Sequence, residues 1–256
     1  MLNALRALRA RLRPCPVNDW RMHDRETMHH FDEPGLPLQP YGLAVPSFPL
    51  RTSTGAPGLD FWFGLGDAWA HMTSRFLPAN PAVLDIGCGC GKLARFLRLN
   101  PTLRYVGVDL FKPSIEWCRR AFAFEGERFR FEHFDGYSAL YNPDGVVQAR
   151  DYRLPVDTAS IDMVVCGSLF THLLEPDAVH YLAEISRALK PGGQALISIH
   201  VEPPPGERFA GDEVRIDIDE AYFLELCANA GLSSAERIGV VYGQVVHRLQ
   251  RAAVQS

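Results

Sequence analysis

The sequence lacks the features that would place the chain in a membrane or outside the cell. Its 256 residues contain no run of 18 or more apolar residues, the length that a spanning helix needs. Arginines occupy the amino terminus, where a secretory signal would have an apolar region. The six cysteines are scattered and match no disulfide or metal-ligand spacing. We therefore expect reduced thiols and a cytoplasmic protein.

An excess of positive charge is also missing. The formal net charge is −4, so no overall charge attracts the chain to nucleic acid or to an anionic membrane. Hydrophobic residues make up 47% of the chain, which is enough for the core of one large α/β domain.

The first sixty residues differ from the rest. Six prolines between residues 34 and 58 exclude a long helix or a central strand there. We expect residues 1–60 to form an arm that lies over a single domain at 61–256. The arm contains several histidines and acids between residues 23 and 32, but their spacing is irregular and we expect no metal site.

Residues 1–13 have the pattern of a short basic amphipathic helix. Leucines share one helical face, arginines flank it, and no acid is present. Such a stripe can lie in a membrane interface and face anionic lipid, which would place the protein at the inner membrane face. Docking on its own domain, docking on a second subunit and a disordered start remain alternatives.

A strand, a glycine-rich turn and a helix follow one another at residues 82–97. An apolar run ends at Asp85, and Gly87, Gly89 and Gly91 come at alternate positions before a helical pattern. Glycine is needed where the backbone turns tightly or a ligand approaches it, and the helix start offers unpaired N–H groups. A second strand ends in Asp109, at a spacing that suits the hydroxyls of a ribose.

Two nucleotide-binding families share this arrangement. Dinucleotide enzymes use G-x-G-x-x-G, whereas here the third glycine comes one residue too early. The stretch from Val83 to Gly91, with an acid closing the next strand, resembles the first motif of class I S-adenosylmethionine-dependent methyltransferases. The resemblance covers about residues 80–200, with a looser match to 250.

Strand and helix patterns alternate along the domain. Apolar strands are expected at 129–134, 161–166 and 195–200, with helices at 60–76, after Pro113, at 177–189 and at 220–230. This alternation predicts an α/β fold with a parallel sheet and helices on both faces. The resemblance implies a seven-stranded Rossmann-like sheet whose last strand is antiparallel.

The resemblance implies S-adenosyl-L-methionine as the cofactor and assigns roles to several positions. The glycines would admit its methionine and ribose, Asp109 its ribose hydroxyls, and Asp85 its amino group. Either Asp135 or Asp151 would face the adenine. The full set of expected cofactor residues is Asp85, Gly87, Gly89, Gly91, Asp109, Leu110, Asp135, Asp151, Tyr152 and Cys166.

Two histidines follow adjacent strands and are candidates for a general base. His172 comes after the fourth strand and His200 at the end of the fifth, and neutral imidazole is the usual base near pH 7. A packed or capping role remains the alternative for each. Tyr137 and Tyr141, in an insertion at 136–147, and Phe170 are expected to line the substrate pocket.

Motifs that are missing limit the classes of molecule that could accept the methyl group. The Asn/Asp-Pro-Pro-aromatic motif of adenine-amino methylation and the Pro-Cys nucleophile of cytosine methylation do not follow the fourth strand. These absences leave small molecules as acceptors. The segment from Ser168 to Leu173 and the Tyr-Asn-Pro loop at 141–143 resemble bacterial methyltransferases of glycan, lipid-linked sugar and secondary-metabolite pathways. This resemblance implies O-methylation of a sugar, a glycan or another small metabolite by in-line transfer, without a nucleic-acid partner. The alternatives are a nucleic-acid or protein methyltransferase and a cofactor-binding protein without catalysis.

Overall fold

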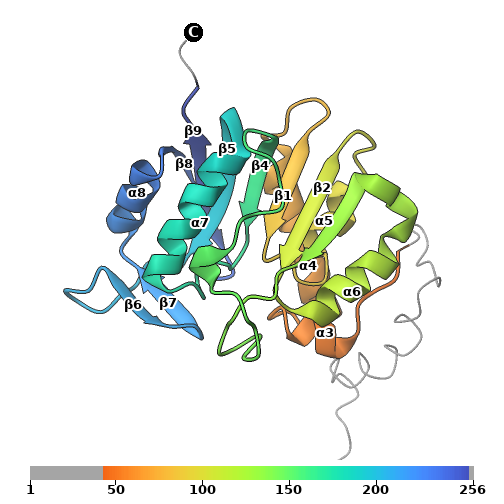
Figure 1. Ribbon diagram of the computed structural model, residues 1–256, viewed down its shortest axis with the longest axis horizontal. Coiled ribbons are helices and arrows are strands. Elements are labelled where there is room, and N and C mark those ends of the chain that lie inside the picture. The colour runs from red at the N-terminus through yellow and green to blue at the C-terminus, as the bar shows by residue number, and fades with distance from the viewer. Residues whose placement is uncertain (1–42, 254–256) are drawn as a thin grey trace, which may run out of the picture.

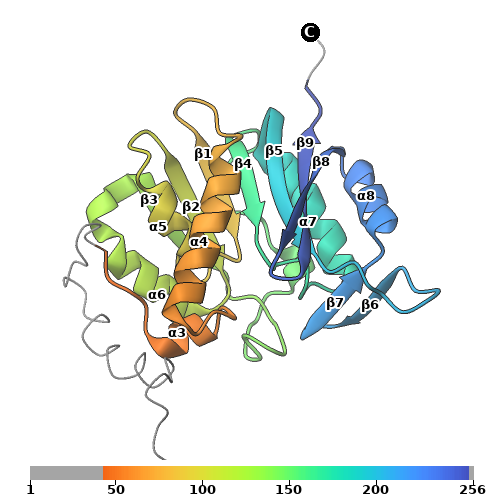
Figure 2. The ribbon, with the colours of Figure 1, turned by 180° about the vertical axis from the view of Figure 1, so that it is seen from behind.

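A seven-stranded sheet forms the centre of the protein. The computed structural model describes residues 43–253, so the predictions for the basic amphipathic helix and the rest of residues 1–42 lie outside it. The strand order is β3-β2-β1-β4-β5-β9-β8 (Figure 1). Helices α4, α5 and α6 cover one face and α7 and α8 the other (Figure 2), which gives three layers. The predicted α/β sheet is confirmed.

The first half of the sheet consists of parallel strands joined by helices. Strand β1 (Ala82–Ile86) is buried along its whole length and pairs with both β2 (Arg104–Asp109) and β4 (Ile161–Cys166). Helix α5 (Lys92–Leu97) connects β1 to β2. Helix α6 (Lys112–Ala121) and a short 3-10 segment, η1 (Ala123–Arg128), lead to the edge strand β3 (Phe129–His133).

The second half ends in an antiparallel pair. Helix α7 (Glu175–Ala188) leads into β5 (Leu189–Ile199), which pairs in parallel with β4. Helix α8 (Glu220–Asn229) precedes β8 (Leu232–Val241) and β9 (Gln244–Arg251). Strand β9 lies antiparallel between β5 and β8, as the resemblance implied.

Two features differ from the sequence-based expectations. Strand β5 begins at Leu189 rather than at Ala195, because Leu189 already pairs with Ile161 before a register shift. A hairpin of β6 (Phe209–Asp212) and β7 (Arg215–Ile218) was not expected and lies beside the main sheet. A 3-10 turn, η2 (Ala149–Asp151), follows the insertion.

Residues 43–58 pack on the domain. Helix α3 (Phe48–Thr52) precedes the long α4 (Leu59–Ser74), close to the expected 60–76. Leu43 is buried, and the guanidinium of Arg95 donates to the carbonyl oxygens of Leu43, at 3.0 Å, and Ala44. These bonds tie this segment to α5. None of the described helices is long and apolar enough to span a bilayer.

Candidate functional site

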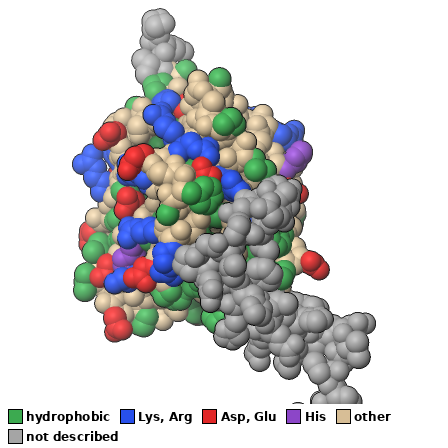
Figure 3. Space-filling view, turned by 90° about the vertical axis from the view of Figure 1, so that its right-hand side faces the viewer, with side chains coloured by type: hydrophobic (Ala, Val, Ile, Leu, Met, Phe, Trp, Pro, Cys, Tyr) green, Lys and Arg blue, Asp and Glu red, His purple; other side chains and the backbone are tan. Residues whose placement is uncertain are grey.

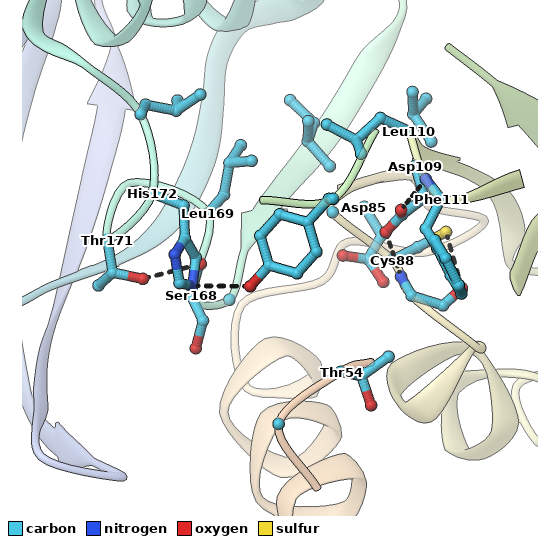
Figure 4. Close-up of a pocket in the computed structure, with 18 of the residues that line it drawn as sticks. Thr54, Asp85, Cys88, Asp109, Leu110, Phe111, Ser168, Leu169, Thr171 and His172 are labelled. Carbon is cyan, nitrogen blue, oxygen red and sulfur yellow. Dashed lines mark hydrogen bonds between the residues drawn. The ribbon is translucent and has the colours of Figure 1, made fainter. Parts of the chain in front are cut away.

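A cavity of about 440 Å³ opens at the carboxyl ends of the parallel strands (Figure 4). Ligands of open α/β sheets bind at this edge. One wall comes from the loops after β1 and β2 and from the turn after α3. The other comes from the loop after β4, the 136–147 insertion, the β6–β7 hairpin and the β8–β9 turn.

The glycine loop after β1 has left-handed backbone at all three glycines. Gly87, Gly89 and Gly91 have φ values of 79°, 52° and 72°, which favour glycine. Gly87 and Gly89 line the cavity, whereas Gly91 does not. A Cβ on Gly91 would lie 3.0 Å from the ring of Phe122, so this glycine permits close packing on α6.

Asp109, at the end of β2, is part of the cavity wall and also holds the glycine loop. Its two carboxylate oxygens accept hydrogen bonds from the backbone N–H of Gly89 and of Phe111, each at 2.7 Å. Burial raises the pKa of Asp109, and the two N–H donors oppose that shift. Figure 4 shows this carboxylate beside Phe111 and Cys88. The expected ribose-binding acid therefore lies in the cavity.

Asp85 lies deeper in the same wall. It accepts a 2.5 Å hydrogen bond from the hydroxyl of Tyr105, and burial raises its pKa to about 7. Lys92, at the start of α5, also lines the cavity and donates to the carbonyl oxygen of Thr54 at 2.9 Å. Burial lowers the pKa of Lys92. A buried cation thus connects the glycine loop to the turn after α3.

The residues expected near the adenine are not gathered in the cavity. Asp135 and Asp151 are both exposed and neither lines it, and the Asp135 carboxylate accepts from Asn142 at 3.1 Å. Tyr152 is also outside the lining and stacks on Phe134, with ring centroids 3.7 Å apart. Phe134 does line the cavity, so this aromatic pair supports its wall. The geometry favours neither acid.

Two predicted site residues belong to the hydrophobic core instead. Cys166 is fully buried and lines no part of the cavity. Side chains alternate along β4, so Val165 faces the cavity and Cys166 faces the other side. Phe170 is fully buried against Phe223, with ring centroids 5.9 Å apart. The structure gives no support for Cys166 at the cofactor or for Phe170 in the substrate pocket.

His172 lines the cavity and has both ring nitrogens engaged. Nδ1 lies 2.8 Å from the carbonyl oxygen of Glu213, and Nε2 lies 3.3 Å from the hydroxyl of Tyr141 (Figure 4). Burial lowers the pKa of His172, a shift to which His200 contributes. His200 and Tyr137, which the sequence analysis also placed at the site, line the cavity too.

The 136–147 insertion and the β6–β7 hairpin meet beside His172 at the cavity. The carboxylate of Glu213, in the β6–β7 turn, accepts from the hydroxyl of Ser138 at 2.5 Å and from the N–H of Leu140 at 3.4 Å. The same residue therefore holds the insertion with its side chain and His172 with its backbone.

Several lining residues were missed by the sequence analysis. They are Thr54, Lys92, Ser168, Glu213, Tyr242 and Gln244. Lys92 directly follows the glycine motif, a signal that could have found it. The others come from turns that carry no motif and reach the cavity only through the tertiary fold.

The cavity fits S-adenosylmethionine. Gly87 leaves the loop open, since a Cβ there would have only the side chain of Leu169 near it, at 3.6 Å. Asp85 and Asp109 offer negative charge to a sulfonium and an ammonium, and Leu110 and Phe134 supply apolar surface. Within residues 43–253 no cluster of His, Cys, Asp and Glu is suited to a metal ion.

Comparison with known proteins agrees with this geometry. Residues 84–197 match the family model described as "Methyltransferase domain". A probable fatty acid methyltransferase of Pseudomonas putida is 28% identical over 57% of this chain and 35% of its own length. A tRNA (carboxymethyluridine(34)-5-O)-methyltransferase of Macaca fascicularis is 32% identical over 51% of this chain and 17% of its own length.

The fold has solved counterparts as well. A Burkholderia thailandensis 1,6-didemethyltoxoflavin-N1-methyltransferase, solved with S-adenosylhomocysteine, has a TM-score of 0.54 at 24% identity, covering 75% of this chain and 78% of its own. The chain spans 35% or less of the first curated relatives it matches. Residues 84–197 are therefore a methyltransferase domain of the class I S-adenosylmethionine-dependent type.

Proposed function

We propose that this chain transfers the methyl group of S-adenosylmethionine to a hydroxyl of a sugar or another small neutral metabolite, with His172 as general base. The observation that supports this most directly is the hydrogen bonding of the His172 ring. Bound S-adenosylmethionine supplies the electrophilic methyl group and the leaving group. The protein must align the acceptor and take up its proton.

The backbone carbonyl of Glu213 selects the tautomer of His172. A carbonyl oxygen only accepts, so Nδ1 must carry the proton that bonds to it at 2.8 Å. Nε2 of the neutral ring then carries a lone pair, which can accept a proton. Because burial lowers the pKa of His172, the ring is neutral at pH 7 and ready to accept a proton.

The Tyr141 hydroxyl shows where an acceptor hydroxyl would donate. It lies 3.3 Å from Nε2 of His172, at the edge of hydrogen-bond distance, so the contact is easily exchanged. An acceptor hydroxyl in this place would give its proton to Nε2 of His172, which would leave its oxygen free to take up the methyl group. The displaced Tyr141 can then donate to another oxygen of the acceptor.

The lining of the acceptor side favours a neutral, polar molecule. Besides the two histidines it offers hydroxyl and carboxamide groups from the side chains of Tyr137, Ser138, Tyr141, Ser168, Thr171, Tyr242 and Gln244. A fatty acid and a tRNA are the substrates named for two relatives, so the comparisons leave the acceptor class open.

Nucleic acid fits the surface less well. Figure 3 shows the side of the molecule next to α6 and β3, where blue and red side chains alternate outside the grey region. Arg119 and Arg130 both pair with Glu132 there, at 3.2 and 3.6 Å. Among the described residues of this face, the intermixing provides no continuous basic groove for a phosphate backbone.

The proposal is tested in two steps with the full-length protein. Calorimetry should show S-adenosylhomocysteine binding to the wild type, and its absence would refute the cofactor assignment. Formation of S-adenosylhomocysteine from S-adenosylmethionine is then measured with panels of glycosides, phenols, fatty acids and unmodified tRNA. Turnover confined to tRNA, or to fatty acids, would refute the small neutral acceptor.

A further inference from the structure

A buried polar network joins the ends of three strands beside the cavity. Ser168 follows β4, Ser198 lies near the end of β5, and Gln244 begins β9. The hydroxyls of Ser168 and Ser198 donate to Oε1 of Gln244 at 3.0 and 2.7 Å. The N–H of Ser168 donates in turn to the Ser198 hydroxyl at 2.8 Å. Both Ser198 and Gln244 are buried.

This network fixes which way the Gln244 carboxamide points. The Ser198 hydroxyl accepts from Ser168, and its other nearby acceptor, the carbonyl oxygen of Cys166, is 3.5 Å away. Its proton therefore goes to Gln244 Oε1, the shorter contact. With two hydroxyl protons on Oε1, the amide nitrogen must point the other way.

The amide nitrogen of Gln244 has two N–H donors and no acceptor among residues 43–253, although the side chain lines the cavity. This nitrogen is not a fully buried atom without a partner, so a water or a ligand group in the cavity can accept its hydrogen bonds. Ser168 adds a second sign of function, because it has a left-handed φ of 61°. Backbone strain of this kind tends to occur at ligand sites.

The sheet order places Gln244 on the acceptor side. The cofactor loop follows β1, and β4 separates β1 from β5 and β9. Gln244 and His200 therefore lie across β4 from the glycine loop, on the side that His172 faces. A ligand group that reaches Gln244 belongs to the methyl acceptor.

We propose that Gln244 binds the methyl acceptor by donating from its amide nitrogen to an uncharged hydroxyl oxygen of a polyhydroxylated molecule. This inference rests on the proposed methyl transfer to a small neutral acceptor. The charges of the cavity agree with an uncharged group, because Asp177 and Glu213 face it while Arg215 is bound to Asp217 at 2.7 and 3.0 Å. Excess negative charge disfavours a carboxylate or phosphate acceptor.

The test uses full-length protein saturated with S-adenosylhomocysteine and a panel of methyl glycosides as probes. Binding is measured by saturation-transfer NMR and titration. Gln244→Met keeps the length of the side chain and removes both donors. We expect the glycosides that bind the wild type to bind this variant roughly tenfold more weakly, the loss of one hydrogen bond. Gln250→Met, on the same strand but outside the cavity, should behave as wild type.

The outcomes separate the two proposals. Equal glycoside binding by Gln244→Met, or no glycoside binding by the wild type, overturns this inference while S-adenosylhomocysteine binding still supports the methyltransferase. Failure of S-adenosylhomocysteine to bind overturns the proposed function instead. If Gln244→Met does not fold, Gln244→Glu serves in its place, because a carboxylate still accepts from both serines but offers no amide donor.

Discussion

Asp109 holds the glycine loop and also lines the cavity in which we expect the cofactor to bind. Each of its oxygens already accepts a backbone N–H, yet a carboxylate oxygen can accept more than one hydrogen bond. Those donors oppose the rise in its pKa that burial causes. A ribose that adds two hydroxyl donors would meet a carboxylate already oriented for it.

Replacing Asp109 by Asn should weaken S-adenosylhomocysteine binding. The amide keeps only one accepting atom, so one backbone N–H and one ribose hydroxyl lose their partner. Hydrogen bonds to a charged group contribute about 1.5–3 kcal/mol, which corresponds to roughly a tenfold to hundredfold loss of affinity. Calorimetry measures it, with the exposed Asp135→Asn as control; unchanged affinity would remove Asp109 from the cofactor site.

His172 should carry the pH dependence of methyl transfer. With a hydroxyl acceptor, His172→Gln should slow turnover by about 10²- to 10⁴-fold and leave S-adenosylhomocysteine affinity unchanged. Because its pKa lies below the ordinary 6.5, the wild-type rate should stay level down to that pH and fall only below it. His180→Gln, whose ring bonds to the Tyr152 carbonyl outside the cavity, is the matched control. A full rate in His172→Gln would make proximity alone sufficient.

At the scale of elements, the turn after α3 closes tightly over the glycine loop. A Cβ on Gly89 would lie 2.5 Å from Cγ2 of Thr54, and Lys92 holds the Thr54 carbonyl from the other side. The position of this turn and the shape of the cofactor loop therefore depend on each other.

Gly89→Ala should disrupt that contact and sharply reduce S-adenosylhomocysteine affinity. The new methyl group collides with Thr54, and the left-handed backbone adds strain of about 1–2 kcal/mol. Combining it with Thr54→Ser, which removes the methyl group it strikes, should restore part of the affinity. Gly192→Ala, also at a positive φ (77°) but with open space around it, is the control. No rescue in the double variant would assign the effect to backbone strain alone.

At the scale of the whole molecule, the burial of Asp85 makes the stability of the fold depend on pH. Its pKa is about 7 in the folded protein against an ordinary 3.8, so the folded state binds more protons than the unfolded state between these values. Stability therefore falls as pH rises through this window and changes no further above it.

Asp85→Asn should stabilise the protein measured without cofactor, and more so at pH 8 than at pH 4. The amide can still accept the Tyr105 hydroxyl but carries no buried charge. Thermal unfolding at the two pH values measures the difference, and the exposed Asp144→Asn should show none. An equal shift at both pH values would show that Asp85 is not titrating between them. The same variant should bind S-adenosylhomocysteine less well.

The β/α order of the domain could be predicted because local patterns determine it. The apolar runs became β1, β2 and β4, and the caps and glycines bounded the helices within a few residues. The β6–β7 hairpin could not, since each strand has only four residues, and the alternation of Ile216 and Ile218 in β7 is too short to identify a strand. Cys166 and Phe170 lie outside the cavity lining for a related reason: which face of β4 borders the cavity, and which way the turn after it points a side chain, depend on the tertiary packing.

The sequence by itself determined the glycine loop and the two acids beside it, Asp85 and Asp109. Glycines at alternate positions and an acid at each strand end are local features, and the backbone they need follows from their own chemistry. The acceptor half was decided only by the tertiary structure. The Glu213 carbonyl that sets the His172 tautomer is 41 residues away, and Gln244 meets Ser168 across 76 residues. Contacts between such distant segments depend on how the strands are ordered and packed, which no local pattern records.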